Sequence, residues 1–163
     1  MAMLAVTSLG AIWSSASPDF GAQGVLDRFG QIEPKVMFAV DGYYYNGKEI
    51  DCRDKIAEVM EKMPSLKKVV IVHYAASARM ATHDVNYFDG FDDFINAYQP
   101  EEIKFERFDF NLPLYIMFSS GTTGIPKCIV HGAGGTLIQH LKEHKLHCDI
   151  RKGDKVFYFT TCG

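Results

Sequence analysis

The chain has 163 residues, of which 47% are hydrophobic and 13% aromatic, enough apolar material for one globular domain with a core. Its 17 basic and 20 acidic residues give a net charge of −3 and form no long run of one sign, which argues against a nucleic-acid groove or a membrane-surface helix. The four cysteines contain no Cys-x-x-Cys pair and no apolar run is long enough to cross a bilayer, so we expect a reduced, cytosolic protein without a zinc ribbon or a disulfide framework.

The first part of the chain predicts helices and strands in alternation. Helices are expected at residues 1–13 (passing into a short strand), 20–30 and 51–63, and buried strands at 36–40 and 69–72. Ser17 or Asp19 could cap the second helix. The alternation is typical of βα units around a parallel sheet, so the expected fold class is α/β, mostly parallel sheet flanked by helices.

A hairpin and a histidine lie beside these strands. The pair Asn46-Gly47, within residues 43–50, is a strong hairpin signal. Its three tyrosines could form a stacking platform for bases, but no basic residues interleave with them, and a half-buried hairpin explains them better. His73 follows the strand at 69–72, where α/β ligands bind, although a local hydrogen-bonding role is favoured over catalysis.

The region before residue 113 contains a predicted loop and a short helix. Residues 75–86 lack periodicity and indicate a surface loop, and a helix ended by Pro100 follows. Three aspartates start this helix, at positions 89, 92 and 93, and they suit its dipole rather than a calcium loop. Three phenylalanines, at 105, 108 and 110, are expected to act as aromatic anchors toward the next strand.

The most informative stretch is a hydroxyl-rich loop after the predicted strand 114–118. Two glycines allow close backbone approach to a ligand, and hydroxyls with one lysine suit phosphate oxygens. The residues of this predicted phosphate loop are Ser119, Ser120, Gly121, Thr122, Thr123, Gly124, Ile125, Pro126 and Lys127. The loop is not a P-loop, because Lys127 does not directly follow a glycine and Cys128 replaces the Mg²⁺-binding Ser or Thr.

The elements predicted after the loop begin with a strand, so we do not expect a helix dipole to hold the phosphate. A strand is expected at 128–131 and a flexible turn at 132–135, before a helix that Thr136 caps and that runs to about Lys145. Leu137, Ile138 and Leu141 are expected to form the buried stripe of this helix. Backbone amides, hydroxyls and Lys127 therefore remain the candidate phosphate donors.

The same helix carries His140-Leu141-Lys142-Glu143-His144, which fits the H-x-x-E-H pattern of inverted zinc peptidases. No glutamate follows His144 as a third ligand, and His147 and Cys148 are too close in sequence to assume tetrahedral geometry. A charged, exposed helix face is the favoured interpretation.

The run Ser-Ser-Gly-Thr-Thr-Gly-x-Pro-Lys resembles the nucleotide-binding loop of the adenylate-forming superfamily of acyl-CoA synthetases, luciferases and peptide-synthetase adenylation domains. The flanks are most similar to its acetoacetyl-CoA synthetase branch, with a short-chain acetyl-CoA synthetase as the alternative. The matching flanks are residues 10–15, Ser17-Pro18-Asp19-Phe20-Gly21, residues 27–36, Ile129-Val130-His131-Gly132 and His147-Cys148-Asp149.

This resemblance implies activation of acetoacetate by ATP to an acyl-adenylate and pyrophosphate, followed by transfer to coenzyme A, within lipid and ketone body metabolism. The phosphate loop, with Mg²⁺, would stabilise charge on the leaving pyrophosphate. No residue need act as a nucleophile or general base, because the carboxylate itself attacks. The partners implied are small molecules, with neither nucleic acid nor membrane.

In extent the chain departs from this family. Residues 1–163 match part of the AMP-binding N-terminal domain, and the acyl pocket, the adenine and ribose motifs and the mobile C-terminal domain are absent. We therefore expect a fragment or truncated isoform that is inactive by itself, with exposed apolar edges. The missing remainder of the synthetase is a possible partner, and a non-catalytic fragment that binds the full-length enzyme is the alternative function.

Overall fold

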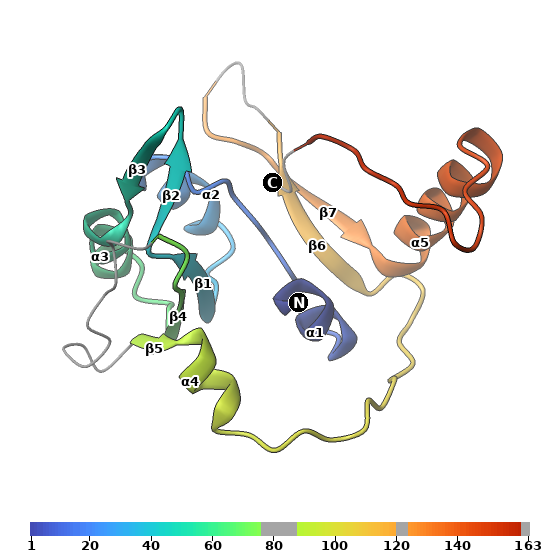
Figure 1. Cartoon of the computed structure of the whole chain (residues 1–163), viewed down its shortest axis with the longest axis horizontal. Helices are drawn as coiled ribbons and strands as arrows, with labels where there is room; N and C mark the ends of the chain where they lie inside the picture. The colour runs from blue at the N-terminus through green and yellow to red at the C-terminus, as the bar shows by residue number, and fades with distance from the viewer. Residues whose placement is uncertain (76–87, 120–123, 161–163) are drawn as a thin grey trace. The chain divides into compact units, whose positions relative to one another are not determined.

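The computed structural model of the chain describes residues 1–75, 88–119 and 124–160, with the side chains of Phe88 and Asp89 excepted. The chain divides into two compact units, one formed by Ala16–Glu102 and the other by Met1–Ser15 with Ile103–Gly163 (Figure 1). We call these the middle unit and the split unit. Among the described residues, no helix has both the length and the apolar character needed to span a membrane.

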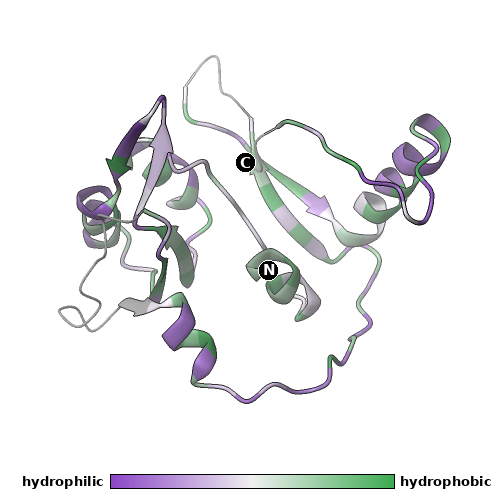
Figure 2. Ribbon diagram, in the orientation of Figure 1, coloured by the Kyte–Doolittle hydropathy of each residue, from purple (hydrophilic) through white to green (hydrophobic). Residues whose placement is uncertain are grey.

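A three-stranded parallel sheet forms the centre of the middle unit. Its order is β1 (Val36–Val40), β4 (Lys68–Val72) and β5 (Phe88–Gly90), and β4 pairs with both neighbours in parallel register (Figure 1). The central strand is the most buried, with Val69, Val70 and Ile71 at 0% exposure. Figure 2 shows the mostly hydrophobic colouring of β1 and β4 that makes this burial favourable. The predicted α/β class and both strands are confirmed, but only β4 is buried: the residues of β1 are exposed or half-buried, with Val36 47% exposed.

Helix α3 (Arg53–Lys62) covers this sheet with Ile56 and Val59, which are 4% and 2% exposed. Helix α2 (Ala22–Phe29) contacts α3, and the short α4 (Phe91–Asn96) follows β5. These three predicted helices are therefore confirmed, but Asp89 lies in β5 and not in the first turn of α4, where only Asp92 and Asp93 are found. The prediction that Ser17 or Asp19 caps α2 is wrong: Gly21 is the N-cap residue and no side chain caps the helix, while the carbonyl of Ser17 accepts the N–H of Phe20 in the preceding turn.

The predicted hairpin is confirmed as β2 (Gly42–Tyr45) and β3 (Lys48–Asp51). Asn46 and Gly47 have φ values of +49° and +72°, the left-handed pair that a tight two-residue turn requires. Tyr44 lies edge-on to Tyr74 with ring centroids 5.9 Å apart, and half of its surface remains exposed. The hairpin is thus partly buried on one side.

The split unit brings three distant segments together. Helix α1 (Ala2–Ser8) is followed by Gly10, whose φ of +74° ends the helical path before the chain reaches Trp13. Strand β6 (Pro113–Phe118) pairs with β7 (Cys128–Gly132) in antiparallel register. The predicted strands on either side of the phosphate loop are confirmed.

The predicted turn at residues 132–135 is wrong, because helix α5 (Ala133–Lys142) already begins at Ala133 with Gly132 as N-cap. The N–H groups of Ala133 and Gly134 donate to the carbonyl oxygens of Leu112 and Phe110, at 2.8 and 2.9 Å. These bonds satisfy donors that a helix start otherwise leaves open, so a Thr136 cap is unnecessary.

The predicted burial of the α5 stripe is also wrong: Leu137, Ile138 and Leu141 are 55–70% exposed. In the part of the chain that the structure describes, the split unit holds α5 through its first turn. The chain then continues into the π-helix η2 (Glu143–His147). Of the predicted aromatic anchors, Phe108 and Phe110 contact Gly10 and Gly134, whereas Phe105 is 82% exposed.

Candidate functional site

Strand β6 carries the chain into the predicted phosphate loop and is hydrogen-bonded on both edges. On one edge Phe118 pairs with Cys128 of β7. On the other, the N–H of Trp13 donates to the carbonyl of Leu114 at 3.0 Å, and the N–H of Ile116 donates to the carbonyl of Trp13 at 2.9 Å. The strand that precedes the loop is therefore fixed by segments about a hundred residues apart.

Ser119 and Lys127 close the neck of the loop. The backbone N–H of Ser119 donates to the carbonyl oxygen of Lys127 at 3.1 Å. In return the backbone N–H of Lys127 donates to the Oγ of Ser119 at 3.3 Å. The two predicted phosphate ligands that are furthest apart in the sequence are thereby brought together.

The structure describes only part of the loop above this neck. Gly124 has a φ of +142°, a region that side-chain-bearing residues seldom adopt, and Pro126 is buried. The predicted residues Ser120, Gly121, Thr122 and Thr123 lie outside the described residues.

The neck offers groups suited to phosphate oxygens. The Lys127 side chain is exposed, and the Ser119 hydroxyl, which accepts the N–H of Lys127, can donate its own hydrogen. The predicted absence of a helix directly after the loop is confirmed, since β7 intervenes before α5. An anion here would be held by local donors and a lysine rather than by a helix terminus.

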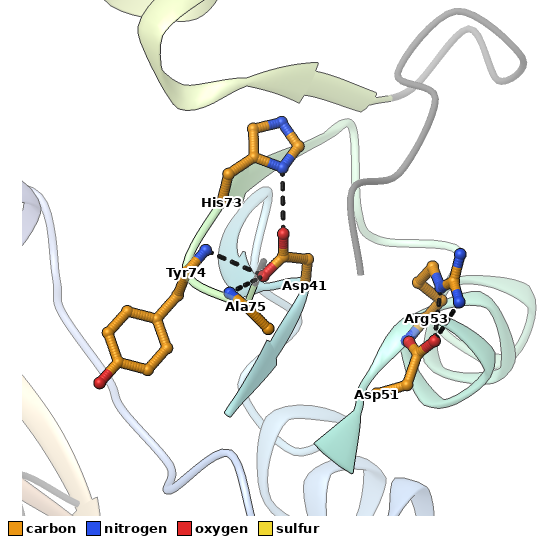
Figure 3. Close-up of polar contacts among 6 residues, drawn as sticks. All are labelled: Asp41, Asp51, Arg53, His73, Tyr74 and Ala75. Carbon is orange, nitrogen blue, oxygen red and sulfur yellow. Dashed lines mark hydrogen bonds and ion pairs between the residues drawn. The ribbon is translucent and has the colours of Figure 1, made fainter. Parts of the chain in front are cut away.

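A second polar cluster lies at the carboxyl ends of β1 and β4 in the middle unit (Figure 3). Asp41 follows β1 and is 0% exposed. One of its carboxylate oxygens accepts the N–H groups of Tyr74 and Ala75, both at 2.9 Å, and the other lies 3.1 Å from Nδ1 of His73. The carboxylate thus ties the end of β1 to the chain that leaves β4.

Burial by itself would raise the pKa of Asp41, but the hydrogen bonds from Ala75, Tyr74 and His73 together hold that pKa below its usual value. The carboxylate is therefore charged at neutral pH and satisfied by its neighbours. His73 contacts this carboxylate, which confirms the predicted local hydrogen-bonding role.

Sequence reasoning did not single out Asp41. The available signal was an acidic residue directly after a buried strand and before Gly42, at the edge where parallel strands end.

Nearby, Asp51 accepts the backbone N–H of Arg53 at 2.8 Å and pairs with its guanidinium, which lowers the pKa of Asp51 (Figure 3).

The H-x-x-E-H residues lie across the junction of α5 and η2. Glu143 accepts a hydrogen bond from the side chain of Gln139 at 2.8 Å and pairs with Lys142 at 3.2 Å. The hydrogen bond from Lys142 is the main reason that the pKa of Glu143 is lowered. Within residues 1–75, 88–119 and 124–160, no three His, Cys, Asp or Glu side chains are grouped so as to hold a metal ion.

Comparison with known proteins gives one consistent result. The family model described as AMP-binding enzyme matches residues 1–162. The acetoacetyl-coenzyme A synthetase of Rhizobium meliloti (strain 1021) is 56% identical over 161 residues, which are 99% of this chain and 24% of the relative. The acetoacetyl-CoA synthetase of Gallus gallus is 51% identical over 168 residues, again covering 99% of this chain and 25% of the relative.

A solved structure agrees with these sequence matches. The acetoacetyl-CoA synthetase from Streptomyces lividans superimposes with a TM-score of 0.88 at 42% sequence identity, covering 99% of this chain and 24% of that chain. The chain therefore spans about a quarter of the length of the relatives it matches. The resemblance predicted from the loop and its flanks is confirmed over nearly the whole sequence.

Proposed function

This chain belongs to the AMP-binding enzyme family, and we propose that it carries the triphosphate-binding part of an acetoacetate–CoA ligase. The observation that carries the proposal is that 99% of the chain matches acetoacetyl-CoA synthetases at up to 56% identity. The closed neck adds support, because the backbone of Lys127 is hydrogen-bonded to Ser119, so the two predicted phosphate ligands lie next to each other in the structure. The proposed overall reaction joins acetoacetate to coenzyme A at the expense of ATP.

The loop residues suit the first half of this reaction. The carboxylate of acetoacetate attacks the α-phosphorus of ATP, the bond to the β-phosphate oxygen breaks, and pyrophosphate leaves with the growing negative charge. Lys127 and the hydroxyl of Ser119 would donate to the β- and γ-phosphates and stabilise that charge. Ser120, Thr122 and Thr123 are proposed as further donors, with Gly121, Gly124 and Pro126 shaping the loop.

The described residues of the loop suit magnesium through the substrate rather than as direct ligands. Ser119 supplies one neutral oxygen and Cys128 follows Lys127, so the described loop has no carboxylate set for the ion. Mg²⁺ ordinarily keeps water ligands and binds substrate phosphates. We propose that it arrives with ATP, where it neutralises phosphate charge.

Acetoacetate is proposed rather than acetate because acetoacetyl-CoA synthetases match this chain closely. We propose that the protein lies in the cytosol, because its four cysteines show no disulfide framework, and cell fractionation would test this. Since the chain spans about a quarter of those relatives, we propose that it does not complete the reaction alone.

The experiment is a turnover assay of the purified chain with ATP, acetoacetate and coenzyme A, measuring AMP and pyrophosphate. The Streptomyces lividans enzyme serves as the positive control. We expect no acetoacetate-dependent AMP above background from the chain alone. Sustained production that requires both acetoacetate and coenzyme A would refute the proposed inactivity while supporting the proposed ligase chemistry.

The exposed aromatic segment near the end of the described chain favours a second candidate function. Phe157, Tyr158 and Phe159 are 80–92% exposed, more than a monomeric surface ordinarily shows in one run. A non-catalytic chain that binds a full-length synthetase through this surface would bury them. Co-purification with an intact acetoacetyl-CoA synthetase, lost on Phe157→Ser with Phe159→Ser, would support this role, and wild-type co-purification that these changes leave intact would contradict it.

A further inference from the structure

Two histidines lie on one face of the last helix of the split unit. His140 belongs to α5 and His144 to η2, four positions further on. Their rings are stacked, with centroids 6.4 Å apart and planes inclined by 27°, and both side chains are exposed. Residues four apart on a helix face each other, so the two imidazoles point to the same side.

We propose that His140 and His144 together form a bidentate site for a divalent transition-metal ion of the Zn²⁺ class. Neutral imidazole is a preferred ligand of zinc, copper and nickel, and zinc binds its nitrogen at about 2.0–2.1 Å. Because both rings are exposed, rotation about their side-chain bonds can bring the two nitrogens around one ion without disturbing a core. Water completes the coordination.

The side chains next to the two histidines determine which ligands a bound metal ion would have. Glu143 directs one carboxylate oxygen, Oε1, to Gln139 and Lys142, and the proposed site is built from the two imidazoles and water. A two-histidine site completed by water binds reversibly and needs no peptidase chemistry. The proposed metal binding is therefore a different function from the zinc-peptidase activity that the H-x-x-E-H motif suggested.

Metal binding to His140 and His144 should affect the helix itself, because the two residues lie on either side of the junction of α5 and η2. His140 lies in the regular α-helix, whereas η2 is wound more widely, with the N–H of Cys148 donating to the carbonyl of Glu143 at 3.0 Å. An ion held by both histidines spans this junction and fixes the first turn of η2 relative to α5. Metal binding should therefore stabilise the end of the helix as well as occupy the two rings.

The test is calorimetric titration of the 163-residue chain with Zn²⁺ in a buffer that does not chelate metals. We expect one saturable site in the wild type. His140→Gln and His144→Gln should each weaken binding at least about tenfold, since even loss of a supporting group around a metal changes affinity on that scale. An equal concentration of Mg²⁺, which prefers oxygen ligands, should not compete.

Matched controls come from the same segment. His147→Gln and Cys148→Ser should leave the Zn²⁺ affinity unchanged, and circular dichroism should show the same helix content in all four variants. Hydrogen exchange of residues 143–147 should slow on addition of Zn²⁺ in the wild type and in both controls. Absence of saturable binding, unchanged affinity in both histidine variants, or a loss caused by Cys148→Ser or His147→Gln would each overturn the proposal.

Discussion

Ser119 and Lys127 are joined by two hydrogen bonds of opposite direction, one from the N–H of Ser119 to the carbonyl of Lys127 and one from the N–H of Lys127 to the Oγ of Ser119. The serine therefore has two roles, since its backbone closes the loop and its hydroxyl both accepts from the backbone and can donate to a phosphate. Lys127 begins the return path and extends an exposed ammonium group. This reciprocal pairing closes the base of the proposed phosphate loop.

Removing the Ser119 hydroxyl should weaken nucleotide binding. Ser119→Ala loses an acceptor for the N–H of Lys127 and a donor to phosphate, and a typical hydrogen bond contributes about 1 kcal/mol, or roughly fivefold in affinity. Ser119→Thr keeps the oxygen and is the matched control. ATP titrations of both variants measure the effect, and equal affinities for Ser119→Ala and Ser119→Thr would show that the hydroxyl is not used.

Adjacent glycines in α5 should respond oppositely to alanine. A Cβ on Gly134 would lie 2.2 Å from the Phe110 ring, whereas a Cβ on Gly135 meets nothing within 4 Å. Gly134→Ala should therefore cost about 1–3 kcal/mol through overpacking. Gly135→Ala should add up to about 1 kcal/mol, because alanine is the better helix former.

Urea unfolding of the two glycine variants checks this pair. Because the positions differ by one residue, changes in general helix propensity affect both variants alike. A Gly134→Ala chain that is as stable as Gly135→Ala would mean that Phe110 does not pack against the start of α5.

Replacement of the buried carboxylate should destabilise the middle unit in a pH-dependent way. Asp41→Asn removes the charge that accepts from Tyr74, Ala75 and His73, and we expect a loss of about 1.5–3 kcal/mol at pH 7. The pKa of Asp41 is lowered in the folded chain. Its stabilisation is thus complete above the unfolded pKa of about 3.9 and is lost as the pH falls through the lower folded value.

Urea unfolding at pH 7 and at several values below 4 measures the difference between wild type and Asp41→Asn. That difference should shrink toward low pH. Asp54→Asn, an exposed position in the first turn of α3, is the control and should change stability little. A difference that stays constant down to pH 2 would contradict a role for the Asp41 charge.

The exposed aromatic segment should limit solubility. Phe157 and Phe159 are 87% and 92% exposed, so exchanging both for serine removes apolar surface without opening a cavity. The double variant should stay monomeric at higher concentration than the wild type, with an unchanged urea midpoint. Val70→Ser, at a position with 0% exposure, should instead unfold the middle unit. Light scattering at matched concentrations measures the oligomeric state of the wild type and the double variant. The same oligomeric state in both would exclude this segment as the cause of self-association.

Local sequence patterns predicted the elements that are determined by residues close together in the sequence. The Asn46-Gly47 turn needs only its two left-handed residues, and the apolar run of β4 is buried on both faces of a parallel sheet. The position of the predicted phosphate loop, between β6 and β7, also follows from the local apolar runs on either side of it. These features were accessible because each depends on residues that are close in sequence.

The features missed by sequence reasoning depend on distant partners. The start of α5 is set by carbonyls of Phe110 and Leu112, so a glycine run that indicates a turn becomes helical. Asp41 depends on N–H groups more than thirty residues away. The exposure of Leu141 was likewise not predictable, because helical periodicity reports an apolar face and not what covers it.

We propose that Lys127 and its loop hold the triphosphate of ATP. The most direct measurement is calorimetric titration of ATP with Mg²⁺ into the wild type, Lys127→Ala and the exposed control Lys152→Ala. We expect saturable binding that Lys127→Ala weakens by about 10- to 100-fold, the range expected for a charge-assisted hydrogen bond, while Lys152→Ala binds as the wild type does. Equal ATP affinity in all three chains, or binding lost equally in both variants, would contradict it.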